Sequence, residues 1–200
     1  MASAEPATGQ SSTGRVGRSR RDQILAAAAE LFARHGYHGV GINDIGAAVG
    51  ISGPALYRHF RGKDAMLGEM LTSISEVLLA GAMSRVGTTG DANSAVEALI
   101  QWQVDFALDN PALITVQERD LGNLAEPDRQ RVRALQRRYV EVWVDAIRRA
   151  VPAIEVPTAR AAAHAVFGLI NSTPHSAHLD RRQMTELLAA MAFAAVTAAG

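Results

Sequence analysis

The chain has 200 residues, 48% of them apolar and none of them cysteine, so it can bury a substantial core but cannot form disulfides or thiolate metal sites. Formal net charge is zero, which excludes a uniformly basic or acidic protein. The N-terminus lacks the apolar segment of a signal peptide, and the most apolar stretch, 187–199, is shorter than the ~20 residues of a membrane span. We therefore expect a soluble, cytoplasmic protein that does not enter a membrane.

Positive charge gathers near the N-terminus. Residues 1–64 carry eight Lys and Arg against five Asp and Glu, whereas the remainder carries twelve against fifteen. The small and polar residues of 1–17 predict a disordered arm, and Arg18 and Arg20 belong to a basic run at its end. This run is either a solvated helix start or an arm that reaches a DNA minor groove or flanking phosphates.

Apolar residues recur at helical spacing along almost the whole chain, and no alternating run of β-branched residues indicates a strand. We predict an all-α fold, with a helix-turn-helix DNA-binding domain over 18–64 and an effector-binding and dimerisation domain over 65–200. The loop at 86–91 is the clearest hinge. The predicted helices cover 18–35, 43–49, 52–60, 63–84, 91–109, 111–123, 127–150, 157–172 and 180–198.

The segment 42–60 contains the most informative motif, two short helices joined by a tight turn. Gly46 is small where two helices must approach closely, and Gly50 permits the left-handed backbone that turns the chain sharply. Ser52 can cap the second helix. The apolar anchors of the pair are Ile45, Val49, Ile51, Leu56 and Phe60. This arrangement is typical of the helix-turn-helix, whose second helix enters the major groove.

The side chains around these anchors suit contact with DNA. Arg58 can bind guanine or a phosphate through two parallel hydrogen bonds, and Tyr57 and His59 can reach phosphates or sugars. Lys63 opens the next helix, close to where the duplex backbone would pass.

These residues resemble the DNA-binding domain of the tetracycline-repressor (TetR) family over 20–67. The phrases that carry the resemblance are Leu31-Phe32 followed by Gly36, then Leu56-Tyr57-Arg58-His59-Phe60, then Lys63 and Leu67. The resemblance implies a homodimer with two basic heads and a C-terminal body. In this family the body binds a small effector, and its last two helices form the dimer interface.

By this resemblance Tyr57 and Lys63 are phosphate contacts, and the positions 52, 55, 58 and 59 face the groove. The chain departs from the family pattern at Gly41, Gly53 and Ala55, where polar residues are frequent. We therefore expect Asn43, Arg58 and the N-terminal arginines to carry more of the affinity. The complete predicted DNA-binding set is Arg18, Arg20, Asn43, Ser52, Gly53, Ala55, Tyr57, Arg58, His59 and Lys63.

The body contains large aromatic residues on several predicted helices, which form either ordinary core or an effector pocket with a few polar anchors. The predicted effector-binding set is Trp102, Phe106, Gln117, Tyr139, Trp143, Phe167 and Asn171. Further candidate anchors are Gln103, Glu118, Arg119 and His175. For the charged run 118–120 we favour a surface ion-pair patch over a buried or functional role. The expected effector is a small hydrophobic molecule such as an acyl chain or an aromatic compound.

Other functions find less support. The arginine-rich face of 127–150 is best explained as a solvated face, with a second nucleic-acid surface or a site for coenzyme A phosphates as alternatives. The histidines at 164, 175 and 178 lack the fixed geometry of a zinc site, so we predict no metal. The sequence contains no nucleophile motif and no glycine-rich phosphate-binding loop, so we predict no cofactor and no enzymatic activity.

The sequence therefore predicts a ligand-responsive transcriptional regulator, in the first place a repressor, that binds a pseudo-palindromic DNA operator as a homodimer through 157–172 and 180–198. The alternatives are a helical ligand-binding protein or enzyme that uses only the body, and a membrane-associated protein that uses 183–199.

Overall fold

A computed structural model describes residues 19–176 and 178–199. That part of the chain is helical and contains no strand, which confirms the predicted all-α fold. The predicted arm over 1–17 and Arg18 lie outside it. The helices are α1 (Arg20–His35), α2 (Ile42–Ala48), α3 (Gly53–Leu56), α4 (Lys63–Thr88), α5 (Ala92–Asp109), α6 (Pro111–Asp120), the 3₁₀ turn η1 (Leu121–Asn123), α7 (Glu126–Ala150), α8 (Val156–Ile170), α9 (Thr173–Ser176) and α10 (Arg181–Thr197).

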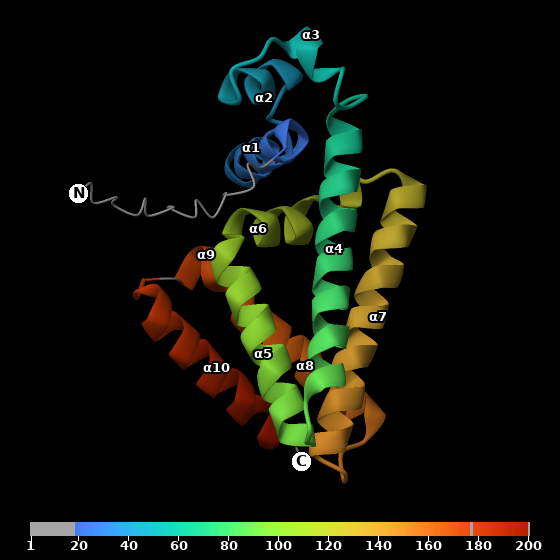
Figure 1. Ribbon diagram of the computed structural model, residues 1–200, viewed down its shortest axis with the longest axis vertical. Coiled ribbons are helices and arrows are strands. Elements are labelled where there is room, and N and C mark those ends of the chain that lie inside the picture. Colours follow the sequence, from blue (N-terminus) through green and yellow to red (C-terminus); the bar gives the residue numbers. More distant parts are fainter. Residues whose placement is uncertain (1–18, 177, 200) are drawn as a thin grey trace, which may run out of the picture.

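The first three helices form a small head at one end of the molecule (Figure 1). Helix α1 begins with a capping box, in which the Ser19 hydroxyl accepts a hydrogen bond from the Asp22 amide at 3.1 Å. Its apolar stripe is buried at Ile24, Ala28 and Phe32. Helix α1 thereby supplies the floor against which the helix-turn-helix packs.

The turn between α2 and α3 depends on two glycines. Gly50 has a φ of 69°, the left-handed conformation that the sequence predicts there. Gly46 is buried, and a β-carbon at its position would lie only 2.7 Å from the carbonyl oxygen of Ile51. The Ser52 hydroxyl accepts the Ala55 amide at 3.4 Å and caps α3 as predicted.

Helix α4 connects the head to the body and runs beside α7 for most of its length (Figure 1). By length and composition it could cross a membrane, but 61% of its most apolar window is buried inside the molecule, as in the core helix of a folded domain. The predicted division at 64/65 falls inside the first turn of α4 and stays a prediction.

The body is a bundle in which α4, α5, α7, α8 and α10 surround a core centred on α7. Trp143 and Ile147 are fully buried there. Helix α6 lies between this bundle and the head and packs against α1 (Figure 1). The head therefore touches the body through α4, which is continuous with both, and through α6.

Two predicted boundaries are wrong, and one short helix is missing from the prediction. Helix α3 ends at Leu56 instead of continuing to residue 60, because the next amides bond to carbonyls three residues back, as in Arg58 to Ala55 at 3.2 Å. Helix α4 continues to Thr88, so the loop predicted at 86–91 is shorter and lies within the body. The short helix α9 was not predicted.

Candidate DNA-reading surface and effector cavity

The tip of the head exposes the side chains that the motif offers to DNA. Leu56 and Phe60 are 0% and 3% exposed and anchor the segment, whereas Tyr57 between them is 58% exposed. Arg58 is exposed too, and within the described residues its side chain takes part in no hydrogen bond or ion pair. Ser52 is exposed, and Ala55 and His59 are half-buried beside it. The segment thus presents a free guanidinium and a phenol on a rigid apolar base.

Asn43 and Gly53 are brought together where α2 meets α3. Gly53 is buried, and a β-carbon on it would overlap the Asn43 carboxamide. Glycine at this position therefore allows the two helices to close with Asn43 at the surface. A lysine, frequent here in the resembling family, would require Asn43 to move.

Lys63 and Arg20, both predicted phosphate or groove contacts, hold the head together in this structure. The Lys63 ammonium donates to the carbonyls of Tyr37 and Val40 at 2.9 and 3.1 Å. Arg20 donates to the carbonyl of Val49 at 2.7 Å, at the end of α2. To contact a phosphate, each of these side chains would have to divide its donors between the phosphate and these carbonyls. Their DNA contacts therefore stay predictions.

The body contains a cavity of about 220 Å³ between α4, α5, α6, α7 and α8. Four of the predicted effector residues line it, namely Gln117, Tyr139, Phe167 and Asn171. The lining also includes Ser75, Leu78, Gln103, Gln136, Val140 and His164. Gln136 was missed, although it lies one helical turn before Tyr139 and Val140 on the same face of α7.

A chain of hydrogen bonds fixes the polar groups of this cavity. The Tyr139 hydroxyl donates to Gln103 Oε1 at 2.7 Å, and Gln103 Nε2 donates to Asn171 Oδ1 at 2.9 Å. Burial raises the pKa of Tyr139, so its hydroxyl stays protonated and keeps its role as donor. Gln117 Oε1 is buried and has no hydrogen-bond partner in the described structure. It is an acceptor available to a ligand.

The other predicted effector aromatics lie elsewhere. Trp143 is fully buried behind the cavity, with its ring centroid 5.0 Å from that of Phe167. Trp102 and Phe106 line a separate hollow of about 670 Å³ between α1, α4, α5 and α6. The Trp102 indole donates to the Leu78 carbonyl at 3.1 Å and stacks under Arg85, which ties it to α4. Of the further anchors, Glu118 and His175 are exposed and outside the cavity.

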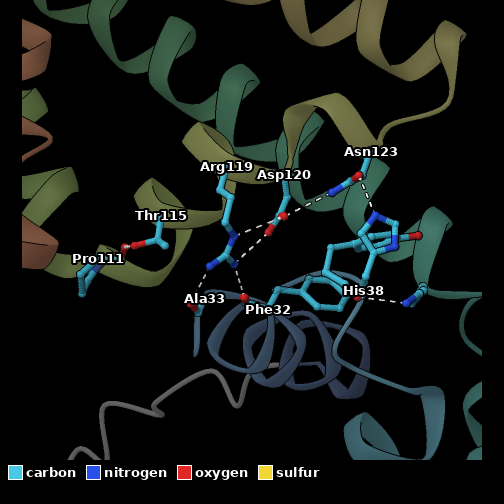
Figure 2. A network of polar contacts seen from close by, with 10 residues as sticks. Phe32, Ala33, His38, Pro111, Thr115, Arg119, Asp120 and Asn123 are labelled. Carbon is cyan, nitrogen blue, oxygen red and sulfur yellow. Dashed lines mark hydrogen bonds and ion pairs between the residues drawn. The ribbon is translucent and has the colours of Figure 1, made fainter. Parts of the chain in front are cut away.

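The charged run 118–120 does not form the surface patch that the sequence favours. Asp120 is only 3% exposed, and Arg119 reaches from α6 to the end of α1 (Figure 2). The prediction is wrong because the burial of Asp120 depends on the position of α6 between the head and the body, which the three adjacent charges do not indicate.

Comparison with known proteins matches both halves of the chain. Residues 24–70 match the family model of bacterial regulatory proteins of the tetR family, and residues 89–175 match the tetracyclin repressor-like C-terminal domain. The transcriptional activator FasR of Mycolicibacterium smegmatis is 34% identical over 102 residues, which are 50% of this chain and 47% of FasR. This match thus spans about half the length of that relative.

Two further proteins resemble the chain over more of its length. The transcriptional repressor KstR2 of Mycobacterium tuberculosis is 25% identical over 66% of this chain and 67% of its own. The structure of AibR in complex with isovaleryl coenzyme A and operator DNA shares the fold, with a TM-score of 0.74, 19% identity, and coverage of 88% of this chain and 98% of that one. The chain belongs to the tetR family of bacterial regulatory proteins, which confirms the family that its helix-turn-helix residues resemble.

Proposed function

We propose that this chain is a dimeric repressor that binds a two-half-site operator through the segment 52–63 and leaves it when a small apolar effector enters the body. The observation that carries the proposal is the exposure of Tyr57 and the unpaired Arg58 between the buried anchors Leu56 and Phe60. A phenol that is 58% exposed beside a free guanidinium contributes little to the packing of the head. Both groups can contact DNA when this segment lies in the major groove.

The remaining head residues take graded roles in this proposal. Arg58 reads a base edge, Tyr57 contacts a phosphate, and Asn43 and Ser52 flank them from α2 and the cap of α3. Lys63 and Arg20 keep the head rigid and contribute charge to the DNA field. Arg18 lies outside the described residues, and its groove contact stays part of the proposal.

The effector cavity constrains the ligand by its chemistry. Among the described residues, no Asp, Glu, Lys or Arg lines the cavity. Burying a charge without a partner is costly, so we expect the buried part of the effector to be uncharged. The unpaired Gln117 Oε1 can accept a hydrogen bond, so we expect the effector to carry a donor such as a hydroxyl or an amide. The volume of about 220 Å³ is below the range of ~300–1,000 Å³ usual for ligand sites, which favours a small molecule.

The dimer interface is proposed along α8 and α10, over the predicted ranges 157–172 and 180–198. Helix α10 exposes Leu187 and Met191 at 45% and 46%, side chains that a second copy of the chain would cover. The two heads of such a dimer would enter successive major grooves ~34–36 Å apart. We further propose that the protein acts in the cytoplasm without catalysing a reaction.

Fluorescence anisotropy with the intergenic DNA that flanks the gene tests the proposal. Wild type should bind with an affinity that falls steeply with salt, by ~0.9 in logarithmic slope for each phosphate contact. Arg58→Ala should weaken specific binding by ~1–3 kcal/mol. The matched control is Arg148→Ala, at the far end of α7 and exposed. Equal binding by all three proteins would refute the proposal.

Separate experiments test effector binding and dimerisation. Thermal stabilisation by medium-chain alcohols, but not by the matching carboxylates, is expected for wild type and should be lost in Gln117→Leu. Sedimentation should show a dimer that Leu187→Glu with Met191→Glu converts to monomer.

A further inference from the structure

The end of α1 is held by an arginine from the body. The last four carbonyls of a helix have no amide partner within it, and in α1 they include those of Phe32 and Ala33. The Phe32 carbonyl accepts the amide of the capping residue Gly36 at 2.8 Å and has room for a second donor. The Arg119 guanidinium on α6 donates to the carbonyl of Ala33 at 3.2 Å and to that of Phe32 (Figure 2). A cation at the C-terminus of a helix also interacts favourably with the helix dipole. Arg119 therefore caps a helix of the head from a different part of the fold.

A buried carboxylate holds this guanidinium in place. Asp120 is 3% exposed, and its Oδ2 lies 3.0 Å from Arg119 Nη2. Asn123 Nδ2 donates to Asp120 Oδ1 at 3.2 Å from the other side. Within the described residues Arg119 is the ion-pair partner of Asp120, so the two charges require each other. Residues of the body, Asp120 and Asn123, thus set the orientation of the Arg119 side chain.

A second tether leaves the same group of residues. Asn123 Oδ1 lies 3.0 Å from His38 Nε2, which belongs to the loop after α1 (Figure 2). Arg119 and Asn123 therefore grip the head at two points, the end of α1 and the loop that follows it, with Asp120 joining them on the body side. We call Arg119, Asp120, Asn123 and His38 the clasp.

The other connection between head and body is α4. It is continuous with both, and Arg21 of α1 is paired with Glu69 on its second turn. A single helix allows the head to pivot about it, whereas two tethers at a second place do not. The clasp, together with the packing of α6 on α1, therefore adds a second attachment to the one that α4 provides.

We infer that Arg119 is a positioning residue for DNA recognition: through the clasp it fixes the angle of each head on its body and so makes the dimer read the spacing between operator half-sites. This inference rests on the proposed function. A base pair inserted between half-sites moves one of them by ~3.4 Å and rotates it by about one tenth of a turn. A rigid dimer cannot follow that change, and a dimer with freely pivoting heads can.

The test uses the full chain and an operator selected by wild type from a random DNA library. Binding is measured by anisotropy on that operator and on versions with one base pair inserted or deleted between half-sites. Wild type should lose at least about tenfold in affinity on the altered spacings, comparable with the cost of a mismatched base pair. Arg119→Gln should lose less than about threefold on the same DNA, with a salt slope like that of wild type.

Two matched variants separate positioning from charge and folding. Glu118→Gln alters the preceding, exposed residue of α6 and should keep the wild-type spacing penalty. Arg119→Lys keeps a cation beside Asp120 but cannot fork between two carbonyls, so an intermediate penalty is expected. If Arg119→Gln folds poorly because Asp120 is left unpaired, Arg119→Gln with Asp120→Asn removes both charges and takes its place.

Hydrogen exchange gives a readout that needs no DNA. The amides at the end of α1 should exchange faster in Arg119→Gln and at the wild-type rate in Glu118→Gln. A wild-type spacing penalty in folded Arg119→Gln would overturn the inference and leave the proposed function intact. Failure of wild type to select any DNA would overturn the proposed function, and the inference with it.

Discussion

The closeness of α2 and α3 makes Gly46 a sensitive point of the head. In Gly46→Ala the new β-carbon would lie 2.7 Å from the Ile51 carbonyl oxygen and 3.3 Å from the Gly53 amide nitrogen. Both are backbone atoms of the turn, and the Ile51 amide is itself bonded to the Gly46 carbonyl at 2.9 Å. The methyl group therefore cannot be accommodated by rotating a side chain, and the turn must open.

The magnitude follows from two opposing effects. Overpacking of this kind costs ~1–3 kcal/mol, and alanine in a helix gains ~1 kcal/mol over glycine. We expect a net loss of up to about 2 kcal/mol in the free energy of unfolding, measured by urea denaturation, and a larger loss of operator affinity because α3 is displaced. Gly87→Ala is the control, since no atom of the described residues lies within 4 Å of a β-carbon there and α4 should gain ~0.5–1 kcal/mol. Wild-type stability and DNA affinity in Gly46→Ala would refute the reasoning.

Three further outcomes follow from single contacts. Tyr139→Phe leaves the buried Gln103 Oε1 without its donor at 2.7 Å, and should cost ~1–3 kcal/mol by urea denaturation unless an effector hydroxyl replaces the donor. Trp143→Ala empties a fully buried site and should cost ~3–5 kcal/mol, enough to lower the melting temperature sharply, whereas equal melting would place Trp143 outside the core. The Ser94 hydroxyl and amide lower the pKa of Asp91, which caps α5. This stabilisation is present above the ordinary carboxyl pKa and is lost as pH falls through the lowered one, so Asp91→Asn should flatten the acid limb of the stability–pH curve; an unchanged limb would contradict the assignment.

Local signals in the sequence were sufficient for most of the head. Gly50 requires a left-handed backbone, Ser52 is a capping residue, and the apolar spacing puts Leu56 and Phe60 inside with Tyr57 outside. Each of these depends on residues within a few positions along the chain. For that reason the helix-turn-helix and its exposed side chains could be predicted without knowledge of the rest of the fold.

The effector cavity could be predicted only in part, because contacts between distant helices decide which aromatic side chains line it. Trp102 is drawn to α4 since Gly81 leaves no β-carbon in its way and Arg85 covers the ring. The rings of Tyr139 and Phe167 stack with their centroids 5.5 Å apart. They belong to α7 and α8, and the sequence of either helix alone does not indicate how the two helices are aligned. The same holds for Asp120, whose burial depends on where α6 is placed.

Helix α6 carries, within three residues, one side chain of each of the two proposed functions. Gln117 offers its unpaired oxygen to the cavity, and Arg119 grips the end of α1, so the two side chains leave the helix on different sides about 200° apart at 100° per residue. A ligand that bonds to Gln117 acts on the same rigid element that orients the head. It need not be large to do so, because the equilibrium moves only by the difference in its affinity for the two positions of α6. A single hydrogen bond to a buried acceptor supplies a difference of this kind, which is why a small cavity is compatible with control of a distant DNA surface.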